Sequence, residues 1–151
     1  MEIVVDSRCD ELLAWLEGMP SFAGGELAVA SADASFRRYF RWTLKGHTYV
    51  VMDAPPDKEP CEPFVKIAEV LLRTGVRVPE ILAQDLDRGF LVLSDFGDLH
   101  YQEAIESDDR DNLYDLALGE ILKLQTGLRE EAKTLDDYDK GWVRMELEIF
   151  R

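Results

Sequence analysis

The stretch FRRYFRWTLKGHTYVVMD at residues 36–53 decides the fold of this chain. Aromatic and β-branched residues fill both of its halves, as is typical of strands, and the turn-forming pair Lys45-Gly46 separates them. Leu27 and Val29 form an earlier apolar run, and a polar turn at 31–35 lies between that run and the stretch. The sequence therefore predicts three strands joined by tight turns, an antiparallel meander.

The second of these strands carries arginines on both of its faces. Successive side chains of a strand point to opposite sides of the sheet. One face therefore carries Arg37, Tyr39 and Arg41. The other face carries Phe36, Arg38, Phe40 and Trp42.

The residues on either side of the meander complete a mixed pattern of helices and strands. A capping box at Ser7 opens a short amphipathic helix before the meander. After it, Pro63 opens a helix whose apolar residues recur at helical spacing up to Gly75. Two apolar runs, 76–82 and 90–93, then flank turn-forming residues and predict a second hairpin. The expected domain is α+β, with a five-stranded antiparallel sheet and a helix.

The pattern after Asp98 is purely helical, with helices expected at 99–106, 111–128 and 141–151. The last of these is apolar around much of its circumference, and its apolar residues are Trp142, Val143, Met145, Leu147, Ile149 and Phe150. Such a helix must be buried in a folded protein. We therefore expect its cover to lie beyond Arg151 and the chain to be truncated.

The composition limits the possible classes of function. The 151 residues carry 31 acidic and 17 basic side chains, a net charge of −14, and their number fits one domain or one domain plus part of another. The acidic excess repels nucleic acids and anionic membrane surfaces, so neither is an expected partner. The N-terminus lacks the pattern of a secretory signal and no apolar run is long enough for a membrane span, which favours a cytoplasmic protein. Cys9 and Cys61 stand outside any CxxC motif and are expected to be reduced thiols without zinc.

The order of these elements resembles the nucleotide-binding N-lobe of the protein-kinase-like fold. Three motifs narrow the resemblance: SADASFRRYFR at 31–41, VMDAPP at 51–56 and LVLSDFGD at 91–98. They resemble the aminoglycoside-phosphotransferase-like family, and most closely its bacterial branch of N-acetylmuramate/N-acetylglucosamine kinases. That branch phosphorylates the anomeric hydroxyl of cell-wall amino sugars, which implies a role in peptidoglycan recycling. Members of the family are longer than this chain, and their catalytic loop and metal-binding Asp belong to the part that this chain lacks.

The resemblance implies three parts: an N-lobe with an N-terminal helix at 1–94, a hinge at 95–98 and the start of a helical C-lobe at 99–151. It also implies an ATP-dependent sugar kinase that uses Mg²⁺, with catalytic and metal-binding residues beyond Arg151. The expected partners are ATP, a small sugar and the remainder of the C-lobe. The chain alone is then expected to be inactive, because phosphoryl transfer needs the missing groups. The alternatives are an aminoglycoside- or choline-type phosphotransferase, and a kinase-like nucleotide-binding or interaction module without catalysis.

The resemblance places the ATP phosphates under the loop between the first two strands. The candidate phosphate-binding residues are Ser31, Asp33, Ala34, Ser35, Phe36, Arg37 and Arg38. Small residues permit close backbone approach, and the two arginines supply positive charge that the acidic chain otherwise lacks. Because Arg37 and Arg38 alternate, at most one of them points into the cleft, and we expect it to be Arg38. The alternative is an ordinary hairpin with solvated arginines.

Kinases place a lysine of the third strand against the ATP phosphates. Here Met52 lies at about that place, and Glu69 lies roughly where a helical glutamate pairs with the lysine. Both are candidate nucleotide-binding residues by this resemblance. The missing lysine favours the non-catalytic alternative, whereas the resemblance to an active branch that also lacks this lysine favours the enzyme. Glu69 has the alternative of a solvated helix residue.

Asp95-Phe96-Gly97 has the letters of the metal-binding DFG motif of protein kinases, but its position differs. A metal-binding DFG follows a catalytic loop of the HRD type, and nothing before residue 95 resembles one. The segment instead follows the fifth expected strand, where a kinase chain crosses between its lobes. Leu93, Ser94, Asp95 and Phe96 are therefore expected to form the hinge, whose backbone binds the adenine edge.

Overall fold

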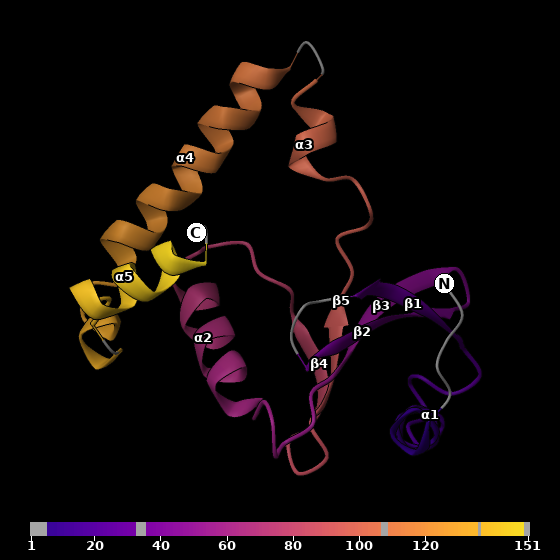
Figure 1. The fold of residues 1–151 in the computed structure, drawn as a ribbon. Coiled ribbons are helices and arrows are strands. Elements are labelled where there is room, and N and C mark those ends of the chain that lie inside the picture. Colours follow the sequence, from indigo (N-terminus) through magenta and orange to yellow (C-terminus); the bar gives the residue numbers. More distant parts are fainter. Residues whose placement is uncertain (1–5, 33–35, 107–108, 136, 150–151) are drawn as a thin grey trace.

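A computed structural model of the protein describes residues 6–32, 36–106, 109–135 and 137–149. Its centre is a five-stranded antiparallel sheet in the order β1-β2-β3-β5-β4 (Figure 1). The strands are β1 (Glu26–Ala32), β2 (Arg38–Leu44), β3 (His47–Asp53), β4 (Ile81–Asp85) and β5 (Phe90–Ser94). The α+β class and the five-stranded sheet expected from the sequence are confirmed.

The turn between β2 and β3 is as short as the sequence predicts. Lys45 and Gly46 have φ angles of 52° and 81°, which is the left-handed pair that fits the twist of a two-residue hairpin. The turn fixes a register in which Leu44 faces His47 and Arg38 faces Asp53. The register in turn assigns every side chain of β2 and β3 to one face of the sheet.

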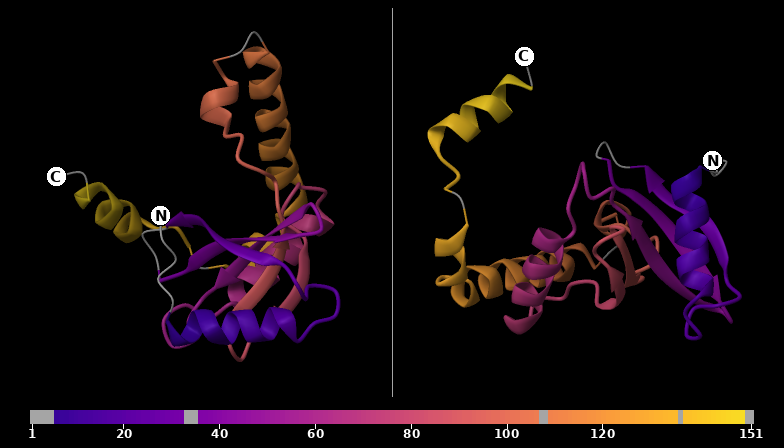
Figure 2. Two further views of the ribbon diagram at one scale, coloured as in Figure 1. Left: turned by 90° about the vertical axis from the view of Figure 1, so that its right-hand side faces the viewer. Right: turned by 90° about the horizontal axis from the view of Figure 1, so that it is seen from below.

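Helix α1 (Ser7–Glu17) covers one face of the sheet (Figure 2). Leu12 and Leu16 are fully buried there, in a core whose sheet residues include Phe40, Trp42, Val51, Phe90 and Val92. The N-cap is Asp6 and not Ser7: Oδ1 of Asp6 accepts the N–H of Cys9 at 2.9 Å. Aspartate and serine cap helices about equally well, so the choice between these neighbours depends on where the helix packs.

Helix α2 (Glu62–Arg73) lies on the opposite face of the sheet. Its first turns contribute Phe64 and Val65 to a second core with Met52 and Cys61. The helix ends where the sequence predicts, since the φ angle of Gly75 is 76° and the residues before it close the last turn. Two helices on opposite faces thus make a three-layer unit, and Cys9 and Cys61 are free and buried within it.

The strand expected at 76–82 is displaced. β4 begins at Ile81 and continues to Asp85, and only its pairing with β5 defines it. Pro79 cannot donate to a ladder, so the chain before Ile81 stays outside the sheet. That segment contacts a later helix instead: the N–H of Arg77 donates to Oε2 of Glu120 at 3.4 Å.

The rest of the chain is helical. It forms α3 (Tyr101–Ala104), α4 (Arg110–Gly127), the 3₁₀ helix η1 (Glu131–Thr134) and α5 (Lys140–Glu148). Figure 1 shows α3 and α4 as an arm that leaves the sheet and returns toward α2. Lys123 anchors α4 there, since its Nζ donates to the carbonyl of Gly75 at 3.1 Å.

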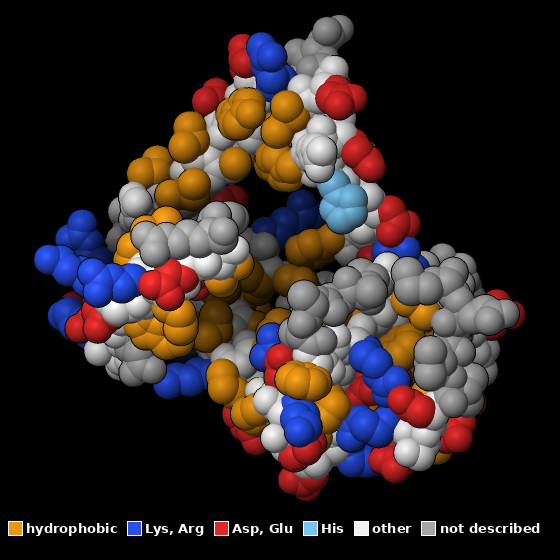
Figure 3. Space-filling view, viewed as in Figure 1, with side chains coloured by type: hydrophobic (Ala, Val, Ile, Leu, Met, Phe, Trp, Pro, Cys, Tyr) orange, Lys and Arg blue, Asp and Glu red, His pale blue; other side chains and the backbone are white. Residues whose placement is uncertain are grey.

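Large apolar side chains are exposed on α4 and α5 (Figure 3). They include Leu116, Ile121, Leu122, Trp142, Met145, Leu147 and Ile149, whereas Phe150 and Arg151 lie outside the described residues. The described part of the chain therefore does not cover the face that was expected to be buried. No helix among the described residues is long and apolar enough to cross a membrane.

Candidate functional site

Strand β2 separates its arginines onto the two faces of the sheet. We call the side covered by α2 the α2 face, which is formed by Tyr39, Val50, Met52, Leu91 and Leu93. The side covered by α1 is the α1 face, formed by Phe40, Trp42, Val51, Phe90 and Val92. Because side chains alternate, Arg37 and Arg41 belong to the α2 face with Tyr39, and Arg38 belongs to the α1 face with Phe40.

The carboxylate of Glu59 holds the exit of the loop between β1 and β2. Its Oε1 accepts the backbone N–H of Phe36 at 3.2 Å, and its Oε2 lies 2.8 Å from Nε of Arg37. Arg37 also borders a hollow beside Pro63 and Phe64, at the start of α2. Backbone N–H groups and guanidinium groups are the donors that bind phosphate in proteins. The loop exit therefore presents phosphate-binding donors on the α2 face, and Glu59 engages them.

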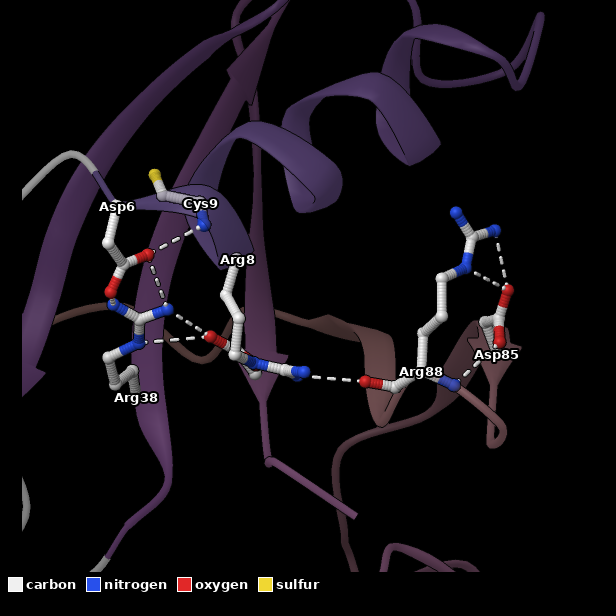
Figure 4. Close-up of polar contacts among 7 residues, drawn as sticks. Asp6, Arg8, Cys9, Arg38, Asp85 and Arg88 are labelled. Atoms are coloured by element: carbon white, nitrogen blue, oxygen red, sulfur yellow. Dashed lines mark hydrogen bonds and ion pairs between the residues drawn. The ribbon is translucent and has the colours of Figure 1, made fainter. Parts of the chain in front are cut away.

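Arg38 belongs to an ionic cluster on the α1 face (Figure 4). Its guanidinium donates to Oδ2 of Asp6 at 2.6 Å and, through Nε, to Oδ2 of Asp53 at 2.9 Å. Arg8 donates to the other oxygen of Asp53, from Nε at 3.0 Å, and to the carbonyl of Arg88 at 2.8 Å. The expectation that Arg38 points into the cleft is not met, because its side chain points to the face that α1 covers.

These contacts shift the pKa of the groups in the cluster. The hydrogen bond from Arg38 is the main cause that lowers the pKa of Asp6 below its ordinary value of 3.8. Burial lowers the pKa of Arg38, but its hydrogen bonds to Asp6 and Asp53 outweigh burial and leave that pKa raised. Arg38 and Asp6 are therefore ionised at neutral pH.

Arg41 connects β2 to the segment that follows β5. Its Nε donates to Oδ2 of Asp95 at 2.6 Å, and its Nη2 donates to Oδ1 of the same residue at 3.2 Å. Its Nη1 donates to the two carboxylate oxygens of Asp98 at 2.7 and 2.8 Å. The Asp95 side chain is 3% exposed, whereas the Asp98 side chain is 84% exposed. One guanidinium thus spans a buried and a solvent-facing carboxylate.

The pKa values of Arg41 and Asp95 shift apart. Burial raises the pKa of Asp95, but hydrogen bonds from Arg41, from the N–H of Gly97 and from Thr48 outweigh it and lower the pKa. The bonds to Asp95 and Asp98 raise the pKa of Arg41. Both Arg41 and Asp95 are therefore charged at neutral pH, and the link between them is ionic.

The backbone of the expected hinge is partly used by the sheet. Leu93 pairs with β3 and β4, Ser94 pairs with β3, and the N–H of Ser94 donates to the carbonyl of Glu80, just before β4, at 2.9 Å. Outside the strand ladders, no backbone–backbone hydrogen bond between described residues engages Phe96, which lies beyond the last ladder pair of Tyr49 with Ser94. The Phe96 ring is 58% exposed. Phe96 therefore keeps backbone groups available for a planar ligand edge.

Met52 and Glu69 do not join the donors at the loop exit. Met52 is fully buried against Leu91 and Leu93, so it offers no surface to a ligand. Glu69 lines a pocket of about 380 Å³ between α2 and β4. Ser31 lies in β1, and Asp33, Ala34 and Ser35 lie outside the described residues.

Among the described residues there is no group of three or more His, Cys, Asp or Glu side chains that could hold a metal ion. The oxygens of Asp95 accept hydrogen bonds from Arg41 and from the N–H of Gly97. The segment 95–97 therefore does not present the free carboxylate that a metal-binding DFG motif needs.

Sequence comparison identifies relatives of this chain. Residues 26–148 match the model of the phosphotransferase enzyme family. The chain is 43% identical over 155 residues to an N-acetylmuramate/N-acetylglucosamine kinase of Pseudomonas aeruginosa and, equally, to one of Pseudomonas putida. It is 35% identical over 145 residues to a kinase of the same name from Neisseria meningitidis. The matches cover 96% of this chain but 45% of each Pseudomonas protein, so the chain spans less than half the length of these relatives.

Proposed function

Because this chain belongs to the phosphotransferase enzyme family, we propose that the complete protein is an ATP-dependent kinase of a small amino sugar and that residues 1–94 form its nucleotide-binding lobe. In this proposal the segment 95–98 is the hinge, and the helices from α3 onward begin the second lobe. The names of its relatives favour N-acetylmuramate or N-acetylglucosamine as the acceptor. We propose the anomeric hydroxyl as the position that is phosphorylated, as the family resemblance of the sequence motifs implies.

One observation carries the nucleotide part of the proposal. Arg37 at the loop exit and Arg41 beside the hinge lie on the same face of β2, about 13 Å apart, since a strand rises roughly 3.3 Å per residue. An extended nucleotide lying along this face has its phosphates near Arg37 and its base near the backbone of Asp95 and Phe96. Arg37 supplies positive charge for the phosphates when a nucleotide displaces or shares its partner Glu59. Arg41 is instead neutralised by Asp95 and Asp98 and lies beside the base.

Phosphoryl transfer depends on positioning and on neutralising the charge that develops on the transferred group. Within this chain, the Phe36 N–H and Arg37 bind and orient the phosphates, and the hinge backbone orients the base. Mg²⁺ neutralises phosphate charge when it is bound, and the described residues contain no cluster to hold it. We therefore place the metal ligands, and the aspartate that orients the sugar hydroxyl, outside this chain. A reaction that consumes ATP also favours the cytoplasm as its location.

A second candidate function is a kinase-like module that binds nucleotide without catalysis. Met52 is buried at the place where kinases usually carry a lysine that contacts the phosphates. The absence of this lysine favours the non-catalytic module. Glu69 also faces the pocket beside β4, where it has no lysine of β3 to pair with.

The decisive experiment uses the protein expressed from the complete reading frame. We expect phosphate transfer from ATP to N-acetylmuramate or N-acetylglucosamine, with phosphorus NMR identifying the anomeric phosphate. An aminoglycoside and choline serve as the competing acceptors. ATP binding without transfer to any of these acceptors supports the non-catalytic module, and transfer to choline or an aminoglycoside alone contradicts the amino-sugar assignment. The isolated 151-residue chain is expected to show no sugar-dependent turnover.

A further inference from the structure

The segment 95–98 is tied at both ends to one side chain. Asp95 and Asp98 each accept hydrogen bonds from Arg41, and together they use its Nε, Nη1 and Nη2. Between them, the N–H of Gly97 donates to Oδ1 of Asp95 at 2.8 Å, and the φ angle of Gly97 is 83°. The guanidinium therefore closes a turn whose shape is set by three separate contacts.

This turn directs Phe96 away from the sheet. Its ring is exposed, and the guanidinium of Arg77 lies 5.7 Å from the ring centroid. Phe96 lies beyond the last ladder pair of Tyr49 with Ser94, and its backbone groups are the ones that the sheet leaves available. Arg41, which fixes the turn, therefore also fixes the direction in which the hinge backbone points.

Arg41 connects an inner strand of the sheet to the segment that follows β5. Arg41 stands opposite Val50 in the ladder, and Val50 stands opposite Leu93, so its stem starts from the centre of the sheet. The nearly buried Asp95 orients the guanidinium with two hydrogen bonds. Asp98 then meets Nη1 from the first residues after the sheet. The contact between Arg41 and Asp98 therefore joins the β-sheet to the helical part of the chain.

We propose that Arg41 is a positioning residue, which holds the turn 95–98 so that the hinge backbone meets the nucleotide base at a fixed angle. The inference rests on the proposed function, because it needs ATP to bind on the α2 face. Arg41 acts through Asp95 and Asp98 and does not transfer or accept any group. The planar guanidinium of Arg41 can donate to both carboxylates at once from differently placed N–H groups. The compact ammonium group of a lysine cannot reproduce this geometry.

The test measures the dissociation constant for ATP by calorimetry, in the complete protein and without sugar. We expect Arg41→Ala to raise this constant about tenfold. Arg41→Lys is expected to recover part of the loss. The matched control is Arg88→Ala, which removes the exposed ion pair with Asp85 at the β4–β5 turn and should leave ATP affinity unchanged. A residue with a structural role alone lowers the amount of folded, active protein but leaves the ATP affinity of the folded fraction as it was.

Asp98→Asn keeps the test decisive if Arg41→Ala does not fold. The Asp98 carboxylate is largely solvent-exposed, so its replacement leaves the core intact. We expect the dissociation constant for ATP to rise about threefold in this variant, and to rise no further when Asp98→Asn is added to Arg41→Lys. If the wild-type protein binds ATP and both Arg41→Lys and Asp98→Asn bind it equally well, the inference is overturned while the proposed function stands. If the wild-type protein does not bind ATP, both are overturned.

Discussion

Arg38 of β2 lies directly opposite Asp53 of β3 in the antiparallel ladder, and the two side chains form an ion pair on the α1 face. Arg8 of α1 binds the same carboxylate and also reaches the carbonyl of Arg88 in the β4–β5 turn. A single buried aspartate thus joins the N-terminal helix to two hairpins of the sheet. The cluster lies immediately after the loop that presents the Phe36 N–H, so it also fixes where β2 begins.

Removing this buried carboxylate is expected to destabilise the fold. Asp53 is 0% exposed, while the Arg8 and Arg38 side chains are 27% and 31% exposed. Breaking a buried pair costs about 3–5 kcal/mol, and the partial exposure of the arginines favours the lower end of that range. Urea unfolding of the complete protein, followed by tryptophan fluorescence, should therefore show a loss of about 3 kcal/mol for Asp53→Ala.

Glu130→Ala is the control for this prediction. It removes an exposed ion pair with Lys133 and should cost less than about 1 kcal/mol. Equal losses for Asp53→Ala and Glu130→Ala contradict the role of Asp53 as a junction.

The two neighbouring arginines should separate into one nucleotide-binding residue and one structural residue. A charge-assisted hydrogen bond contributes about 1.5–3 kcal/mol, so Arg37→Ala is expected to weaken ATP binding about tenfold or more. Arg38→Ala should lower the unfolding temperature and leave ATP affinity nearly unchanged, because Arg38 faces α1. Calorimetric titration and thermal unfolding of both variants provide the two readouts. A large loss of ATP affinity in folded Arg38→Ala alone would return the phosphate-binding role to Arg38.

Glu59 competes with the phosphates for the same donors. Its carboxylate accepts from the Phe36 N–H and pairs with Arg37, so a nucleotide must displace it or share those groups. Glu59→Gln keeps the size of the side chain and removes its charge, and we expect ATP to bind about threefold more tightly. Glu62→Gln is the matched control, because Glu62 is exposed at the start of α2. Weaker ATP binding by Glu59→Gln would mean that Glu59 mainly orders the loop.

The local parts of the fold could be predicted because short-range chemistry decides them. Lys45-Gly46 makes a two-residue turn, and Pro63 and Gly75 bracket α2. The start of β4 could not be predicted, because an edge strand is defined by its partner, and only pairing with β5 separates residues 76–80 from Ile81.

For the candidate site, too, local features could be predicted from the sequence and contacts between distant residues could not. Period two correctly placed Arg37 and Arg38 on opposite faces, but it cannot say which face α1 covers. The link from Arg41 to Asp95 joins residues 54 positions apart, and such distant pairing leaves no local pattern. The sequence shows two acidic residues, Asp95 and Asp98, and an arginine in the middle of β2, Arg41. Nothing in the sequence indicates that they bind one another.

The stability of the protein at acidic pH should depend on Asp95. Burial raises the pKa of this carboxyl, but the bonds from Arg41, Gly97 and Thr48 lower it below its ordinary value of 3.8. A carboxyl whose pKa is lower in the folded state stabilises the fold above its unfolded pKa, and that contribution is lost as the pH falls through the folded pKa. Urea unfolding from about pH 5 to about pH 2 should therefore show a flatter curve for Asp95→Asn than for the wild type. Arg41→Ala should flatten the curve in the same range, and an unchanged slope in both variants argues against the ionic link.

Gly89 should tolerate a side chain far less well than Gly46, although both have left-handed backbones. Their φ angles are 75° and 81°, so alanine at either position carries a conformational cost of about 1–2 kcal/mol. At Gly89 a Cβ would also lie 1.8 Å from the carbonyl oxygen of Ala54, whereas nothing lies within 4 Å at Gly46. The N–H of Ala54 donates to the carbonyl of Gly89 at 2.9 Å, so the clash separates the β4–β5 turn from the end of β3. We therefore expect Gly89→Ala to lose about 3 kcal/mol or more of unfolding free energy in urea, and Gly46→Ala to lose about 1 kcal/mol. Similar losses for the two variants would mean that the chain relaxes around Gly89 and that the close approach to Ala54 does not constrain the sheet.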